Sequence, residues 1–161
     1  MKWKEFRGAA EELAEAAEKL FEKSGVLLLG TVRKDGSPRI SPVEPFIVEG
    51  ELYLGIMWRT LKALDLLRDP RCTVHNLIRD RHATEGEFKL HGRARDVQDE
   101  VTRDRFCDAV KKKLGWSPKG MKYHLFAIEV ESAALFTADG NARLVKRWRA
   151  GQSVEEYRQT M

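Results

Sequence analysis

The stretch Val26-Leu27-Leu28-Leu29-Gly30-Thr31-Val32-Arg33-Lys34-Asp35-Gly36-Ser37 decides the fold. Its first seven residues form a short apolar run, which predicts a buried strand. The Asp35-Gly36 pair follows at once, and an Asp-Gly pair between two extended segments is a strong hairpin signal. The chain is therefore expected to turn back directly beside this strand, as it does in an antiparallel sheet.

Extended segments continue after this turn. Residues 38–48 form a second run that contains Pro42 and Pro45. Proline cannot donate to a sheet ladder, so this run is expected to be bulged, split or at a sheet edge. The hairpin-length links among the first three strands favour an antiparallel barrel over a parallel doubly wound sheet. Further strands are expected at residues 52–57, 71–78, 87–97, 122–136 and 141–149.

Helical segments are expected around these strands. Residues 5–23 carry apolar side chains at i, i+3 and i+4 spacing, which predicts an amphipathic helix. Thr60 is the expected N-cap of a short helix over 61–68, and Asp99 begins another helix. The expected layout is an N-terminal helix packed on the barrel (residues 1–24), a barrel domain (25–149) and a C-terminal tail (150–161) that is helical over 154–159.

The composition is that of a soluble domain. The 161 residues are 42% hydrophobic and 34% charged, which suffices to bury a core. No apolar run is long enough to cross a membrane, and no apolar segment follows Met1–Glu5, so no span and no secretory signal are expected. Cys72 and Cys107 lie far apart and give neither a disulfide framework nor metal-like spacing. We therefore expect a cytoplasmic protein.

The charge pattern bears on the class of partner. The net charge is +4, and the excess is spread along the chain. A nucleic-acid-binding protein more often concentrates basic residues on one face, so no nucleic-acid partner is expected. A mild positive excess suits a small anionic ligand at least as well.

The segment around Thr60 predicts an anion site. A helix N-terminus carries unpaired N–H groups and partial positive charge, so basic side chains are disfavoured there. Arg59 and Lys62 nevertheless flank Thr60, and the first turn contains no acid. A bound phosphate would resolve this conflict, because backbone N–H groups, the Thr60 hydroxyl and two cations would hold it together. The alternative is that both cations are ordinary solvated surface residues.

Two other segments are candidates for ligand contact. The irregular strand Arg39-Ile40-Ser41-Pro42-Val43 would leave backbone groups free for the polar edge of a planar ligand, although an edge strand protected by prolines explains it too. Trp148 stands among Lys146, Arg147 and Arg149, where its ring could cover a flat anionic ligand or simply lie in the core.

No residue is assigned a catalytic acid or base role. The four histidines show no helical zinc-site spacing, so no metal site is expected. No Ser/His/Asp or Cys/His order is recognisable in the chain. Those histidines are His75, His82, His91 and His124.

Read in order, several short motifs resemble the pyridoxamine 5′-phosphate oxidase-like superfamily, the flavin/deazaflavin split-barrel oxidoreductases. The resemblance covers about residues 6–149, and the order and spacing of the motifs are more specific than any one of them. The motifs are Gly30–Arg39, Gly50–Leu54, Thr60-x-Lys62, Arg68–Arg71 and Glu87–Ala94.

The resemblance implies a mainly β fold with flanking helices, an antiparallel split β-barrel of the FMN-binding type. It also implies a homodimer with two cofactor sites at the subunit interface. In such proteins a Ser/Thr and a Lys before the short helix hold the flavin phosphate, and these fall on Thr60 and Lys62. The strand whose backbone lines the isoalloxazine falls on Arg39–Val43, and the strand end before the phosphate loop on Gly55 and Ile56.

Other positions match the family less directly. Leu61 stands where the family often has a phosphate-binding Arg, and Arg59 is positioned to replace it. An aromatic residue that reaches the partner subunit's cofactor would fall on Trp148. The substrate-phosphate motif of the true oxidases, of the Arg-Leu-His-x-Arg type, is absent. Oxidation of pyridoxine phosphate is therefore not expected.

Two classes of function follow from the resemblance. The first is an oxidoreductase that transfers a hydride between FMN, or a deazaflavin coenzyme, and a small apolar or quinone-like acceptor. The second is a non-catalytic protein that binds or stores flavin, haem or another tetrapyrrole, with one of the four histidines as the haem ligand. The sequence leaves FMN and deazaflavin open, and it does not name the substrate.

Overall fold

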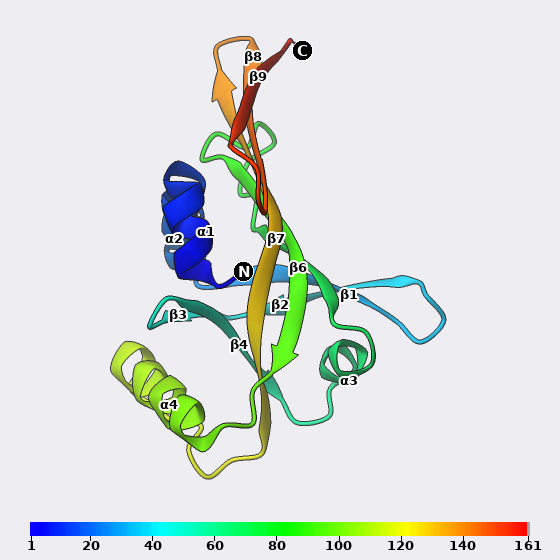
Figure 1. The fold of residues 1–161 in the computed structure, drawn as a ribbon, viewed down its shortest axis with the longest axis vertical. Helices are drawn as coiled ribbons and strands as arrows, with labels where there is room; N and C mark the ends of the chain where they lie inside the picture. The colour runs from blue at the N-terminus through cyan, green and yellow to red at the C-terminus, as the bar shows by residue number, and fades with distance from the viewer. Residues whose placement is uncertain (161) are drawn as a thin grey trace.

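A computed structural model describes residues 1–160, which form nine strands and four helices (Figure 1). The first hairpin is as predicted. Strand β1 (Leu27–Val32) pairs antiparallel with β2 (Pro38–Val43), and Gly36 occupies the turn with a φ of 84°. That φ lies in the left-handed region, which glycine adopts without steric cost.

The sheet curls into a split barrel because consecutive strands occupy its two ends. Its order is β2-β1-β5-β6-β7-β4-β3, so β2 and β3 (Pro45–Val48) are the terminal strands. Only Glu44 separates them in the chain, so the two ends of the sheet lie next to each other. The run of residues 38–48 is therefore split, and Pro42 and Pro45 each sit on a terminal strand as expected.

The remaining strands are antiparallel, and all of them except β9 lie close to their predicted bounds. They are β4 (Glu51–Met57), β5 (Arg71–Asn76), β6 (Glu87–Asp96), β7 (Tyr123–Asp139), β8 (Ala142–Arg149) and β9 (Glu155–Thr160). Strand β7 is the longest, with 17 residues. Its first half pairs with β4 and its second half with β8, while β6 pairs along its other edge. Strand β7 therefore connects the barrel to the β8–β9 hairpin, which extends beyond it in Figure 1.

The predicted single helix over residues 5–23 is two helices. Helix α1 (Trp3–Ala9) and helix α2 (Glu11–Ser24) are broken at Ala10, whose φ is −149° and ψ is 59°. The break brings α1 back along α2, so that Trp3 reaches Phe21 with ring centroids 6.1 Å apart. Burial of Trp3 and of Phe6 therefore outweighs helix continuity here.

The predicted helical tail over 154–159 is wrong, because this segment forms β9. Every residue of β9 is exposed, and the strand pairs with β8. The pairing sets Glu156 opposite Lys146, with a charged contact of 3.2 Å, and Arg147 lies over the Tyr157 ring. Cross-strand pairs of this kind favour the strand over a helix that would stand alone in water.

Two helices flank the barrel near its lower end in Figure 1. Helix α3 (Leu61–Arg68) lies against β1, and helix α4 (Glu100–Leu114) covers the outer side of β4 and β7. Asp99 caps α4 by accepting a hydrogen bond from the Thr102 N–H at 2.8 Å, as predicted. The larger core fills the barrel interior under α1 and α2, and a smaller core lies under α4.

Candidate functional site

A cleft of about 670 Å³ lies between the end of β4, β2, α4 and the turn before α3. This volume is within the usual range for small-molecule sites. Half of the twelve residues predicted for ligand contact line it, and they come from three separate segments. These six are Pro42, Val43, Gly55, Ile56, Thr60 and Lys62.

The α3 N-terminus at this cleft carries unpaired backbone donors. Thr60 is the N-cap residue, but its side chain does not cap the helix; its hydroxyl donates to the Met57 carbonyl at 3.1 Å. The first turn contains no acidic residue. The Arg59 guanidinium makes no hydrogen bond or ion pair with any residue that the structure describes. An anion at this helix end would meet free N–H groups and a free cation, and the Thr60 hydroxyl would donate to it by exchanging its bond to the Met57 carbonyl.

Lys62 points across the cleft toward β2. Its Nζ donates to the Pro42 carbonyl at 2.7 Å. Burial lowers the pKa of this ammonium from its ordinary value, and no carboxylate compensates it. An anionic ligand group beside Nζ would restore the charge balance. Lys62 thus joins the predicted phosphate site to the backbone of the second predicted segment.

Arg39 is engaged elsewhere, because it anchors α3 to the barrel. Its Nε donates to Asp65 Oδ2 at 2.7 Å, and Asp65 is only 3% exposed. The Thr31 hydroxyl and Arg68 also donate to this carboxylate. Burial alone would raise the pKa of Asp65, but the hydrogen bonds from Arg39, Arg68 and Thr31 outweigh it and lower the pKa. The Arg39 side chain therefore holds the helix whose N-terminus faces the cleft.

Four more of the predicted residues lie beside the cleft rather than in its lining. Arg59 and Leu61 are exposed on either side of Thr60, and Leu61 is 61% exposed. Ile40 is 71% exposed on the outer side of β2, and Ser41 is half-buried on the opposite side. Their side chains do not face the cleft.

Trp148 requires a correction. It is 2% exposed and packs on Phe6 in the barrel core, with ring centroids 4.9 Å apart. The period of two along β8 turns Trp148 inward, while its neighbours Arg147 and Arg149 are turned away from the core. Within this chain the ring is therefore part of the core, which was the second of the two interpretations.

An aromatic wall of the cleft was not predicted from the sequence. Strand β3, α4 and the segment after α4 bring together rings and a methionine: Phe46, Phe106, Trp116, Met121 and Tyr123. Trp58 adds a further ring from the turn before α3 and stacks on His124. Gly55 lies under this wall, where an added Cβ would stand 2.8 Å from Phe106 Cζ. The segment 116–121, which follows a helix end and contains both Trp and Met, was the available signal.

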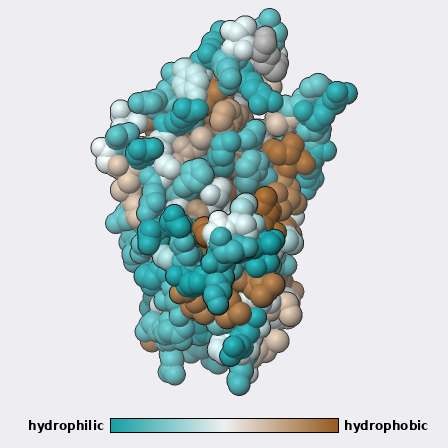
Figure 2. All heavy atoms as spheres, turned by 90° about the vertical axis from the view of Figure 1, so that its right-hand side faces the viewer, coloured by the Kyte–Doolittle hydropathy of each residue, from teal (hydrophilic) through white to brown (hydrophobic). Residues whose placement is uncertain are grey.

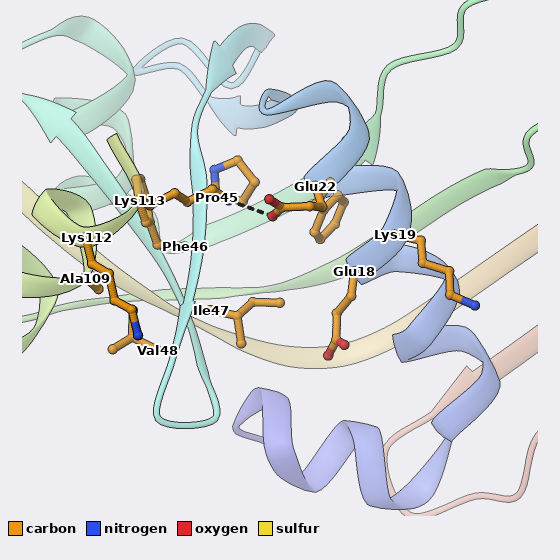
Figure 3. Close-up of a pocket in the computed structure, with 11 residues that line it drawn as sticks. Glu18, Lys19, Glu22, Pro45, Phe46, Ile47, Val48, Ala109, Lys112 and Lys113 are labelled. Atoms are coloured by element: carbon orange, nitrogen blue, oxygen red, sulfur yellow. Dashed lines mark hydrogen bonds and ion pairs between the residues drawn. The ribbon is translucent and has the colours of Figure 1, made fainter. Parts of the chain in front are cut away.

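A second cleft of about 710 Å³ lies between α2, β3 and α4 (Figure 3). Its apolar floor includes Phe46 and Ile47, and charged side chains stand at its rim. Two of these charges pair across it, since Lys113 Nζ lies 2.8 Å from Glu22 Oε2. None of the predicted contact residues is among those that line this cleft.

Comparison with known proteins settles the family. Residues 13–147 match the sequence profile described as pyridoxamine 5′-phosphate oxidase. The chain belongs to this family. The match spans most of the barrel and includes the three predicted segments that line the cleft.

Several solved structures share the fold. A pyridoxamine 5′-phosphate oxidase-related, FMN-binding protein from Nostoc punctiforme has 14% identity and a TM-score of 0.66, covering 94% of this chain and 96% of that one. A putative pyridoxamine 5′-phosphate oxidase from Listeria innocua has 16% identity and a TM-score of 0.64, covering 77% and 98%. A haem-binding protein from Mycobacterium smegmatis has 17% identity and a TM-score of 0.62, covering 83% and 57%.

Because the identities are low, these similarities establish the split-barrel fold and nothing beyond it. No curated protein matched the chain. Over residues 1–160, none of the helices has the length and apolar character needed to cross a membrane.

Proposed function

We propose that this family member binds FMN in the cleft and serves as a flavin-dependent oxidoreductase toward a small acceptor. The observation that carries the proposal is the uncapped N-terminus of α3, which lies with Arg59, Thr60 and Lys62 at one end of an apolar cleft. The helix end would bind the phosphate of FMN, and the apolar remainder of the cleft would hold its flat ring system.

The residues present fit such a group. Thr60 and the first N–H groups of α3 would bind the phosphate, and Arg59 and Lys62 would neutralise its charge. The backbone of Pro42 and Val43 and the exposed Gly55 would lie along the ring system. When bound, FMN supplies hydride transfer. The aromatic wall excludes water from that part of the cleft, and no side chain here is assigned a proton-transfer role.

The first experiment is flavin binding by the purified chain, measured by fluorescence quenching. Replacing Lys62 with alanine is expected to weaken FMN binding by about 1.5–3 kcal/mol, the scale of a hydrogen bond to a charged group. Lys62→Met, which keeps the aliphatic stem, should lose nearly as much. Lys34→Ala removes one exposed cation from the β1–β2 turn and should leave affinity unchanged.

The same titration separates the cofactor alternatives. Unchanged FMN affinity in the Lys62 variants would contradict the phosphate assignment. Tight binding of a deazaflavin coenzyme in place of FMN would redirect the proposal to a deazaflavin-dependent reductase. Haem is the third arm, because one structural relative is a haem-binding protein. A Soret band after hemin addition, without flavin binding, would favour the non-catalytic binder instead.

We also propose a homodimer, supported by hydrophobic side chains exposed around the cleft. Met57, Leu61 and Ile40 are 77%, 61% and 71% exposed. Figure 2 shows the face that carries α3 and the β1–β2 hairpin, and hydrophobic patches are visible there among hydrophilic side chains. Burying such side chains at an interface is favourable. Sedimentation equilibrium is expected to give twice the chain mass, and Ile40→Glu is expected to shift the protein toward monomer.

A further inference from the structure

His124 stands behind the turn that presents the proposed phosphate site. It lies near the start of β7, opposite Ile56 at the end of β4, and is 6% exposed. Its Nε2 accepts a hydrogen bond from the backbone N–H of Arg59 at 3.2 Å. A buried side chain of the barrel is therefore bonded directly to the turn that precedes α3.

The turn needs such a contact because its backbone is strained. Arg59 has a φ of 54°, in the left-handed region that residues other than glycine rarely adopt. Strained residues persist only when surrounding contacts determine their conformation. Within the turn, Met57 O accepts from both the N–H and the hydroxyl of Thr60, at 3.4 and 3.1 Å. His124 adds the contact from outside the turn.

Trp58 completes the arrangement. Its ring stacks on the imidazole with centroids 4.4 Å apart and an interplanar angle of 7°. Trp58 also lines the cleft and is 50% exposed. The turn is thus fixed to His124 twice, once through the Arg59 N–H and once through the Trp58 ring.

We propose that His124 is a positioning residue that holds the turn Met57–Thr60 in its anion-binding conformation, and that it does so only as neutral imidazole. Nε2 must keep its lone pair to accept from Arg59, so the proton resides on Nδ1. Protonation would turn Nε2 into a donor facing another donor, and the turn would be released. The effect on ligand affinity rests on the proposed function, whereas the effect on the turn does not.

The surroundings of His124 keep it neutral near pH 7. Burial lowers the pKa of this imidazole, and the positive charges of Arg103 on α4 and Arg59 in the turn lower it further. The negative charge of Asp96 at the end of β6 raises the pKa of His124, but the pKa stays below its ordinary value. The neutral form therefore persists somewhat below pH 6.5, the ordinary histidine value.

The first test uses the chain without any ligand. Heteronuclear NMR of the imidazole nitrogens is expected to show the Nδ1–H tautomer at pH 7.5. On acidification, the Arg59 amide shift is expected to follow the His124 titration with the same midpoint, below pH 6.5. The opposite tautomer, or an Arg59 amide that ignores this titration, would overturn the proposal even if FMN binds tightly.

The second test measures FMN affinity at pH 7.5 in two variants. His124→Phe keeps a stacking ring but loses the acceptor, and is expected to bind FMN about 3- to 10-fold more weakly. His124→Gln retains an acceptor oxygen near the Nε2 position and should rescue most of this loss. Below pH 6.5, wild type should lose more affinity than His124→Gln, because only wild type carries the imidazole that protonates. The flavin phosphate titrates equally in both proteins, so its effect cancels in the comparison. Denaturant unfolding would first show that wild type and His124→Phe are both folded. Equal FMN affinities of the two proteins would then overturn the proposal.

A double-mutant cycle isolates the backbone strain. Glycine adopts positive φ freely, so Arg59→Gly removes the strain that His124 offsets. The loss caused by His124→Phe should therefore be smaller in the Arg59→Gly background than in wild type. Strict additivity would show that His124 acts on the ligand by some other route. If wild type binds no FMN, the proposed function fails. The NMR titration then remains the test of whether neutral His124 holds the turn.

Discussion

Replacing Asp65 with alanine is expected to lower the free energy of unfolding by about 2–4 kcal/mol. The change leaves the buried Thr31 hydroxyl without its acceptor and removes the partner of Arg39 and Arg68. Loss of one member of a buried charged group costs more, about 3–5 kcal/mol, when the other charges stay buried. Here Arg39 and Arg68 are 20% and 38% exposed, so both can reach water and the cost is smaller.

Urea unfolding would measure this loss, and Asp69→Ala is the matched control. Asp69 lies at the other end of α3 and pairs with Arg71, whose side chain is 65% exposed. An ion pair with an exposed partner contributes less than about 1 kcal/mol, and Asp69 also accepts the Arg71 N–H, so this variant should lose clearly less stability than Asp65→Ala. Equal stabilities of the two variants would contradict the anchoring role of Asp65.

The pH dependence of stability tests the contacts of Asp65 independently. The pKa of Asp65 is lowered in the folded state, so the carboxylate stabilises the fold above the unfolded value of about 3.8. As the pH falls through the lower folded pKa, wild type loses this contribution while Asp65→Ala has none to lose. The stability difference between them is therefore expected to shrink below about pH 4. Because α3 also carries the proposed phosphate site, FMN affinity should fall with the same substitution.

The anchor shows how far the sequence could predict the site. Thr60 and Lys62 were predicted because a helix start that carries basic residues and no acid in its first turn is a local pattern. Asp65 lies on that same helix, but two of its three partners, Thr31 on β1 and Arg39 on β2, are 34 and 26 residues away. No local pattern encodes that contact. The sequence accordingly placed Arg39 in a strand whose backbone would line the ligand, and it did not show that the Arg39 side chain binds Asp65.

The same distinction explains the errors in the fold. The barrel strands, α3 and α4 follow from apolar runs, turn residues and caps that lie next to one another in the chain. The break at Ala10 depends on Trp3 and Phe6 reaching Phe21 and Trp148. Strand β9 depends on charges across from it on β8. His124 was considered from the sequence only as a haem ligand, and its bond to Arg59 could not be predicted for a similar reason, since the two residues are 65 positions apart.

Gly92→Ala is expected to destabilise the barrel by at least about 2 kcal/mol, because backbone rather than a flexible side chain occupies the space. An added Cβ would lie 2.1 Å from the Glu129 carbonyl oxygen and 3.4 Å from Val130 Cα. This close approach occurs where the β6–β7 register shifts between His91 and Gly92. The irregularity lies partway along β7, between its pairing with β4 and its pairing with β8.

Gly30→Ala is the control for this substitution. Gly30 also lies inside a barrel strand, but its added Cβ would stand 3.5 Å from Thr73 Cβ, an ordinary van der Waals contact. Alanine costs less backbone entropy than glycine in a strand, so Gly30→Ala should be neutral or slightly stabilising. Thermal unfolding of both variants would compare them directly. If Gly92→Ala proved as stable as Gly30→Ala, β6 and β7 would have to separate at this point at no cost, and the close backbone approach at Gly92 would not constrain the sheet.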